Sequence, residues 1–340
     1  MWFSALAVLA VGLVLAACGG DDDAKTDKSG GGDSAPKAKI GLVLPDYTQN
    51  ELILGAKEGA EAAAEELGVE LIVAEGSGDV TEQVRSIEDM VTSQVDVLMY
   101  DAIDETGVGP AIKAADEAGV KIVCIVSCTD EGNHAARIDF DYETEMGVPT
   151  GEWLAEAVPS AKKIGFVDSN QVNPAVAAMY DGVRSALSSA GIDPKLEISP
   201  PTDWDKGKAL TVARDFLTAN PDLDALMCMH DLIAGACLDA IRELDYKKIP
   251  VGGEGGTCEG LTNIVEGRQA FTVIQDLHPA GAEGVRMAKE LAEGKTLTET
   301  EKFIPMAAVT TEILKGIQSG SEEAVINGVD VKALLEGCQK

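Results

Sequence analysis

Short apolar runs alternate with longer amphipathic stretches from residue 39 onward. The apolar runs predict β-strands over 39–44, 69–74, 95–100 and 120–126. The stretches between them predict helices over 51–67, 80–92 and 105–118. Continuous apolar strands separated by helices are typical of a parallel sheet that helices cover on both faces. Because crossover connections are right-handed, such a sheet is doubly wound.

The same pattern starts again in the second half of the chain. The run Lys163-Ile164-Gly165-Phe166-Val167 echoes Lys39-Ile40-Gly41-Leu42-Val43. Strands are then predicted over 163–167, 195–198, 223–229, 249–252 and 270–274, and helices over 174–190, 205–219, 231–244 and 257–266. A last helical segment is expected over roughly 321–337. The predicted fold class is α/β, with two similar doubly wound parallel-sheet lobes in tandem.

The N-terminus differs in character from this body. Residues 1–17 are almost entirely apolar and end in small residues, as a secretory signal does. The ending Leu15-Ala16-Ala17-Cys18 resembles the lipobox of bacterial lipoproteins, which implies cleavage before Cys18 and acylation of that residue. Residues 18–38 are small and polar and predict a flexible tether. We therefore expect an extracytoplasmic protein that is anchored to the membrane through Cys18.

The charge limits the possible partners. The formal net charge is -31, and such an acidic surface repels nucleic acid phosphates. No second long apolar run follows the first one. We expect a monomer that binds no nucleic acid.

The cysteines and glycines offer little support for catalysis. Beyond Cys18 the chain has Cys124, Cys128, Cys228, Cys237, Cys258 and Cys338, whose pairing the spacing leaves open. Cys228 and Cys237 lie in apolar surroundings and are expected in the core. No zinc spacing and no dinucleotide fingerprint occurs, so no metal or cofactor is expected.

One enzymatic alternative comes from the segment Gly256-Thr257-Cys258-Glu259-Gly260, which matches a nucleophile elbow. A cysteine hydrolase would use Cys258, with His278 as the base and Asp276 as its orienting group. Acid and histidine two positions apart are expected to point in different directions, which disfavours this alternative.

Polar residues follow the predicted strands. They include Asp46 to Asn50, Asp101, Ser127, Ser169, His230, Asp231 and Glu254. In parallel α/β sheets, ligand sites form beyond the carboxyl ends of the strands. These residues are therefore candidates for one site.

Four stretches, in order, resemble the type I periplasmic binding proteins of ABC importers, particularly the ribose-binding branch. They are 54–71, 201–231, 251–255 and 274–295. The resemblance covers roughly 37–315. It implies a two-lobed binding protein that closes on a small ligand and docks on an ABC permease. The implied boundaries are 39–140 plus 276–305 for one lobe, 141–275 plus 306–315 for the other, and 316–340 for an extension. The implied hinge lies near 140–142, 275–276 and 304–308.

The resemblance also implies residue roles. The stacking aromatic falls on Trp204, and the polar groups fall on Gln49, Asn50, His230, Glu254 and Gln275. Both arginines of a typical ribose site are absent, because Ser127 and Ala177 stand in their places. The residues expected to contact the ligand are Asp46, Tyr47, Gln49, Asn50, Asp101, Asp141, Trp204, His230, Asp231, Glu254 and Gln275.

The expected ligand is a neutral sugar or polyol. A cationic amine is the alternative, because carboxylates hold ammonium groups as well as hydroxyls. Service to a sensor in place of a permease is a further variant.

Overall fold

The computed structural model describes residues 37–169, 174–202 and 205–338. The expected signal segment over 1–17 and the lipidation residue Cys18 lie outside the described residues, as does the tether up to residue 36.

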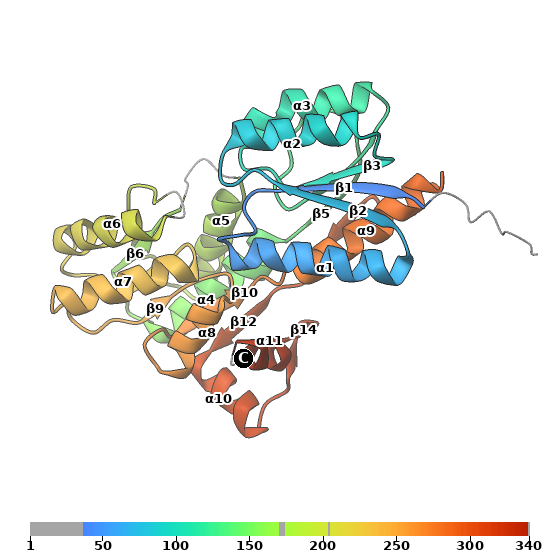
Figure 1. The fold of residues 1–340 in the computed structure, drawn as a ribbon. Coiled ribbons are helices and arrows are strands. Elements are labelled where there is room, and N and C mark those ends of the chain that lie inside the picture. The colour runs from blue at the N-terminus through green and yellow to red at the C-terminus, as the bar shows by residue number, and fades with distance from the viewer. Residues whose placement is uncertain (1–36, 170–173, 203–204, 339–340) are drawn as a thin grey trace, which may run out of the picture. The chain divides into compact units, whose positions relative to one another are not determined.

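The first sheet has six parallel strands in the order β11-β5-β4-β3-β1-β2. Its strands are β1 (Lys39–Leu44), β2 (Glu70–Glu75), β3 (Val97–Tyr100), β4 (Lys121–Ile125), β5 (His134–Asp139) and β11 (Glu301–Phe303). Helices α1 (Glu51–Leu67) and α9 (His278–Ala292) pack together on one face, and α2 (Val80–Thr92) and α3 (Glu105–Glu117) on the other (Figure 1). This arrangement is doubly wound, as predicted.

The second sheet also has six strands, in the order β12-β10-β9-β8-β6-β7. Its strands are β6 (Lys163–Val167), β7 (Lys195–Ile198), β8 (Ala225–Cys228), β9 (Val251–Gly252), β10 (Phe271–Ile274) and β12 (Ala307–Thr310), of which β12 is antiparallel to β10. The helices are α4 (Val148–Ala157), α5 (Pro174–Ser189), α6 (Lys206–Ala219), α7 (Asp231–Glu243) and α8 (Cys258–Val265). Helices α4 and α5 pack together, as do α6 and α7.

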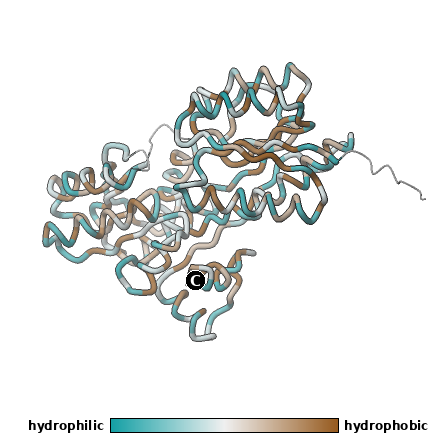
Figure 2. Tube along the Cα trace, viewed as in Figure 1, coloured by the Kyte–Doolittle hydropathy of each residue, from teal (hydrophilic) through white to brown (hydrophobic). Residues whose placement is uncertain are grey.

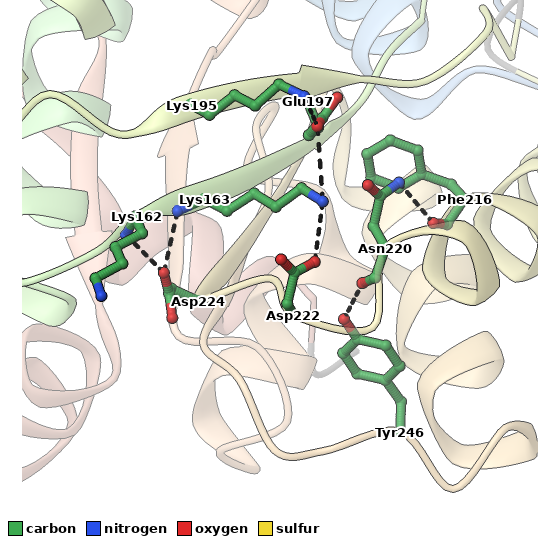
Figure 3. A network of polar contacts seen from close by, with 9 residues as sticks. All are labelled: Lys162, Lys163, Lys195, Glu197, Phe216, Asn220, Asp222, Asp224 and Tyr246. Carbon is green, nitrogen blue, oxygen red and sulfur yellow. Dashed lines mark hydrogen bonds and ion pairs between the residues drawn. The ribbon is translucent and has the colours of Figure 1, made fainter.

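The two lobes share a local motif as well as a topology. In each, an aspartate just before the third strand accepts a hydrogen bond from the backbone N–H of the lysine that starts the first strand. Asp96 accepts from Lys39 at 2.8 Å, and Asp224 accepts from Lys163 at 3.1 Å. Figure 3 shows the second of these, with Lys163 Nζ also 2.9 Å from Asp222. The sequence echo at residues 39 and 163 therefore corresponds to a structural repeat.

The helix boundaries follow from capping. The side chains of Asn50, Asp79 and Asp104 accept backbone N–H groups of the first turns of α1, α2 and α3. Helix α1 ends at Gly68, whose φ of 68° is left-handed. These boundaries are the ones predicted from the sequence.

The chain passes between the sheets at three places, after β5, after β10 and after β11. The first of these segments continues as a π-helical turn, η1 (Tyr142–Gly147). Gln275 Nε2 in the second segment donates to the Tyr142 hydroxyl at 2.8 Å. Met306 N–H in the third segment donates to Glu145 Oε2 at 2.8 Å. All three segments are therefore hydrogen-bonded to one another through η1.

Several elements of the fold were absent from the prediction. They are strands β5, β11 and β12 and helix α4. Strand β5 reads His134-Ala-Ala-Arg137-Ile-Asp139, so polar residues interrupt its apolar pattern.

The C-terminal segment is not one helix over 321–337. It contains α10 (Thr311–Ser319), a hairpin of β13 (Val325–Ile326) and β14 (Val329–Asp330), and α11 (Val331–Gly337). Asn327 and Gly328 form the turn with φ values of 47° and 84°, which is the strong Asn-Gly hairpin signal.

The core lies within and around the two sheets. Figure 2 shows the strands of the first sheet as markedly hydrophobic, and Ile40, Leu42 and Leu44 are fully buried there. In the second sheet, Trp153 stacks on Phe271 with ring centroids 4.7 Å apart. None of the described helices is long and apolar enough to cross a membrane.

Replacing Gly281 with alanine tests the close contact between α1 and α9. A Cβ at Gly281 would clash with the backbone carbonyl oxygen of Ala56, so the two helices would have to separate. We expect the free energy of unfolding to fall by about 2 kcal/mol, measured by chemical denaturation. The control is Gly337→Ala, because that helical position has open space around it. An equal effect of both substitutions would contradict the close approach.

Candidate functional site

Buried and half-buried polar side chains lie at the carboxyl ends of the strands of the second lobe. Asp168 and Ser169 follow β6, Thr202 follows β7, His230 follows β8 and Glu254 follows β9. Within the described part of the chain, Ser169 Oγ, Thr202 Oγ1 and Glu254 Oε2 are buried and have no hydrogen-bond partner. A buried polar atom without a partner is costly, and a ligand would supply the missing hydrogen bonds.

The electrostatics of this half-site follow from burial. Burial raises the pKa of Glu254 to about 8, and the neighbouring charges of Asp231 and Asp168 raise it further in the same direction. Burial lowers the pKa of His230 to about 4, so its imidazole is neutral. His230 Nδ1 accepts the N–H of Leu232 at 3.2 Å, which leaves the proton on Nε2. The half-site thus offers one imidazole donor beside acidic groups.

Asp231 is the site candidate whose position differs most from the expectation. It is fully buried at the start of α7. Its carboxylate accepts hydrogen bonds from Gln269 Nε2 at 2.7 Å, from Thr272 Oγ1 at 2.9 Å and from Thr257 N–H at 3.0 Å. Because protein donors already engage both oxygens, Asp231 supports the loop after β9, and we leave it out of the ligand contacts.

In the first lobe, Asp101 follows β3 and is buried. Its Oδ1 accepts the N–H of Ser127 at 3.1 Å. Burial first, and then the charge of Asp139, raises the pKa of Asp101 to about 8. Burial also raises the pKa of Asp139, at the end of β5, to about 6. Asp139 was not among the candidates from the sequence, because strand β5, which it ends, was not predicted.

The loop that presents Ser127 is constrained. Cys124 and Cys128 form a disulfide around it. Val126, inside this loop, has a φ of 65°, which is unusual for a β-branched residue. The short covalent ring holds the Ser127 amide toward Asp101.

The predicted residues of the first loop lie together before α1. Asp46 Oδ1 accepts Gln49 N–H at 3.0 Å, and Asn50 Oδ1 caps α1 by accepting Leu52 N–H at 3.0 Å. The Tyr47 ring lies 5.4 Å below Lys57 Nζ. The loop is partly to fully exposed, so these side chains are accessible to a ligand.

The remaining candidates lie at the crossing segments or outside the described residues. Asp141 caps η1 by accepting Thr144 N–H at 2.9 Å, and Gln275 bonds to Tyr142 as described above. Trp204 lies outside the described residues. Tyr180, on α5, was not among the candidates from the sequence. Burial is the main cause that raises its pKa, followed by the charges of Asp168 and Glu254.

The structure contradicts the cysteine hydrolase alternative. Cys258 forms a disulfide with Cys338, so it has no free thiol to act as a nucleophile. Cys228 and Cys237 are free and buried, as expected of core residues.

The expectation that Asp276 and His278 point apart was wrong. His278 Nδ1 lies 2.8 Å from Asp276 Oδ1, and Nε2 lies 3.2 Å from Glu58 Oε2. Asp276 is the main cause that raises the pKa of His278. The histidine therefore links the second crossing segment to α1 as part of an ion-pair group.

Comparison with known proteins gives a consistent result. The periplasmic binding protein domain matches residues 40–296. The ribose import binding protein of Salmonella typhimurium is 25% identical over 259 residues, which cover 76% of this chain and 86% of that protein. The xylitol-binding protein of Mycolicibacterium smegmatis is 21% identical over 305 residues, covering 89% and 83%.

The fold has close structural neighbours. An ABC transporter solute-binding protein from Mycobacterium smegmatis with bound glycerol has a TM-score of 0.76 and 24% identity, over 82% of this chain and 96% of that one. A solute-binding protein from Bacillus halodurans with bound myo-inositol has a TM-score of 0.74 and 20% identity, over 84% and 99%. The α/β fold class and the type I resemblance are thereby confirmed. The chain belongs to the periplasmic binding protein domain family.

Proposed function

We propose that the protein is a non-enzymatic, extracytoplasmic solute-binding protein that binds a small sugar or polyol and presents it unaltered to an ABC permease. The observation that carries this proposal is the set of buried, unpartnered polar atoms at the strand ends, namely Ser169 Oγ, Thr202 Oγ1 and Glu254 Oε2. Hydroxyl groups of a sugar or polyol would act as donors and acceptors for these atoms. The relatives named above bind ribose and xylitol according to their names.

The three hydrogen-bonded crossing segments support a binding mechanism by closure. A ligand that contacts both lobes favours the closed arrangement, because these contacts form together only there. Import is favoured over sensing because the ribose-binding relative is named for import.

The disulfides support an extracytoplasmic location. Cys124–Cys128 and Cys258–Cys338 are the kind of bonds that persist in oxidising compartments. Anchoring through an acylated Cys18 is part of the proposal and rests on the sequence.

Ligand-dependent stabilisation tests the proposed function. In a thermal shift panel of ribose, xylitol, myo-inositol and allose, we expect at least one compound to raise the melting temperature in a concentration-dependent manner. The physical reason is that a ligand bound only by the folded state adds RT ln(1 + [L]/Kd) to the free energy of unfolding. If no sugar or polyol at millimolar concentration shifts the transition, the proposed ligand class is wrong.

The substitution Asp101→Asn tests the first-lobe half-site. It keeps the shape of the side chain but replaces the carboxyl group with an amide that has different donors and acceptors, so we expect the affinity for the ligand found in the panel to weaken by about 1–3 kcal/mol in calorimetry. Asp215→Asn, at an exposed position on α6, is the matched control and should leave the affinity unchanged. Unchanged affinity in Asp101→Asn would remove this residue from the site.

Detergent partitioning tests the lipid anchor. Acyl chains add about 0.8 kcal/mol of membrane affinity per buried methylene group, so the mature protein should enter the detergent phase of a Triton X-114 extract of the native host. The Cys18→Ser variant should stay in the aqueous phase. Partitioning of both proteins into the aqueous phase would contradict acylation.

A further inference from the structure

The carboxyl groups of the candidate site converge on one residue of the first crossing segment. Tyr142 is half-buried, and its hydroxyl accepts a hydrogen bond from Gln275 Nε2 at 2.8 Å. The charges of Asp139 and Asp101 in the first lobe and of Glu254 in the second all act on its hydroxyl. Acidic groups from both lobes therefore surround the same place, next to the segment where the chain crosses between the sheets.

In the described part of the chain, no ion pair joins Glu254 to a lysine or an arginine. Its Oε2 is buried without a hydrogen bond among the described residues. The charged groups that act on it are Asp231 and Asp168, both acidic, and the other titratable neighbours are the neutral His230 and the phenols of Tyr180 and Tyr142. Arg184 lies over the ring of Tyr180 at 5.7 Å from its centroid, and its side chain is 54% exposed and lies 3.4 Å from Asp181.

The first lobe does not supply the missing positive charge either. Arg137 Nη2 donates to the carbonyl oxygen of Thr129 at 3.1 Å and lies 3.4 Å from His134 Nδ1. Its charge acts on Asp139 and Glu105. The positive charge of this guanidinium therefore interacts with acidic groups of the first lobe itself.

A buried carboxylate is stabilised either by a proton or by a cation in contact with it. Without a cation, Glu254 takes the first route, because burial raises its pKa to about 8. A ligand with an ammonium group would provide the second, while its hydroxyls would satisfy Ser169 Oγ and Thr202 Oγ1. A neutral polyol would form the hydroxyl hydrogen bonds but would bring no positive charge to the acidic groups.

We infer that the physiological ligand is an amino sugar or an aminoalditol, whose protonated amine contacts Glu254. This inference rests on the proposed function and narrows its ligand class. The relatives named above bind neutral sugars and polyols by their names, so the positive charge would be a particular feature of this chain.

The pH dependence has a defined sign. Burial raises the pKa of Glu254 to about 8, so at about pH 6 the group is protonated and must lose its proton before it can hold a cation. The affinity for an amine should then rise by up to about tenfold per pH unit from about pH 6 as Glu254 ionises, and it should fall again at the pH where the ligand's own ammonium group loses its proton. A neutral polyol needs no such proton release, so its affinity should not rise over this range.

Calorimetry with matched ligand pairs tests the inference. The pairs are glucamine with sorbitol, glucosamine with glucose, and galactosamine with galactose, each of which differs by one amine in place of one hydroxyl. In at least one pair we expect the amine to bind at least about tenfold more tightly, since a charge-assisted hydrogen bond is about twice as strong as a neutral one. Titration in buffers of different ionisation enthalpy should show proton release with the amine.

The variant Glu254→Gln should remove this preference and the rise with pH. Glu259→Gln is the matched control, because Glu259 is on neighbouring α8, is exposed and pairs with Lys206. This control removes the same charge from the surface and should keep the amine preference. If Glu254→Gln does not fold, the wild-type pH profile and proton release still decide the question.

The outcomes distinguish a failure of the amine inference from a failure of the proposed function. Equal or tighter binding of the neutral member in every pair that binds would overturn the amine inference and leave the proposed function in place. An amine preference that persists in Glu254→Gln would overturn the role of Glu254. If neither these compounds nor the neutral panel binds, the proposed function fails together with the inference.

Discussion

The hydrogen bonds that join the three crossing segments are the constraint on which the site depends. Tyr142 bonds to Gln275, and Glu145 bonds to the amide of Met306. Each lobe has its own sheet and its own packed helices, and the crossings are where the chain joins the two. Because one π-helical turn is hydrogen-bonded to both other segments, a change of conformation in one crossing would strain the bonds to the others.

The candidate site contains polar atoms that the fold buries without giving them hydrogen-bond partners among the described residues. Asp231 shows the contrast, since its carboxylate receives three protein donors and supports the loop after β9. Glu254, only a short distance along the same sheet edge, has a buried oxygen without a partner. Burial raises the pKa of both carboxyl groups, to about 7 for Asp231 and to about 8 for Glu254, so the two residues differ in their hydrogen-bond partners and not in the direction of the shift. Of the two, Glu254 is the one with a buried oxygen that lacks a partner among the described residues.

The disulfides reinforce the regions around the site. Cys124–Cys128 closes the loop that orients the amide of Ser127 toward Asp101. Cys258–Cys338 links the start of α8 to the C-terminal segment, which also packs through Val329, Val331 and Leu335 against Leu314 and Ile317. The glutamate at the start of α1, Glu51, accepts the amide N–H of Cys258 at 3.1 Å. The disulfide therefore attaches the C-terminal segment next to the hydrogen bond between Glu51 of α1 and Cys258 of α8.

The sequence by itself determined the alternation of strands and helices, the repeat that starts at Lys163 and most element boundaries, which agree within two residues. These features are local, because apolar periodicity and capping residues such as Asn50 and Asp79 act over a few positions. The sequence missed β5, since Arg137 and Asp139 interrupt its apolar pattern, and it missed the Asn327-Gly328 hairpin although its signal was present. Only the tertiary structure decided which cysteines pair, that Asp231 is engaged by the protein, and that Asp139 and Tyr180 belong to the site region. Those properties depend on contacts between residues far apart in the chain, and no local pattern encodes the burial that sets their charge states.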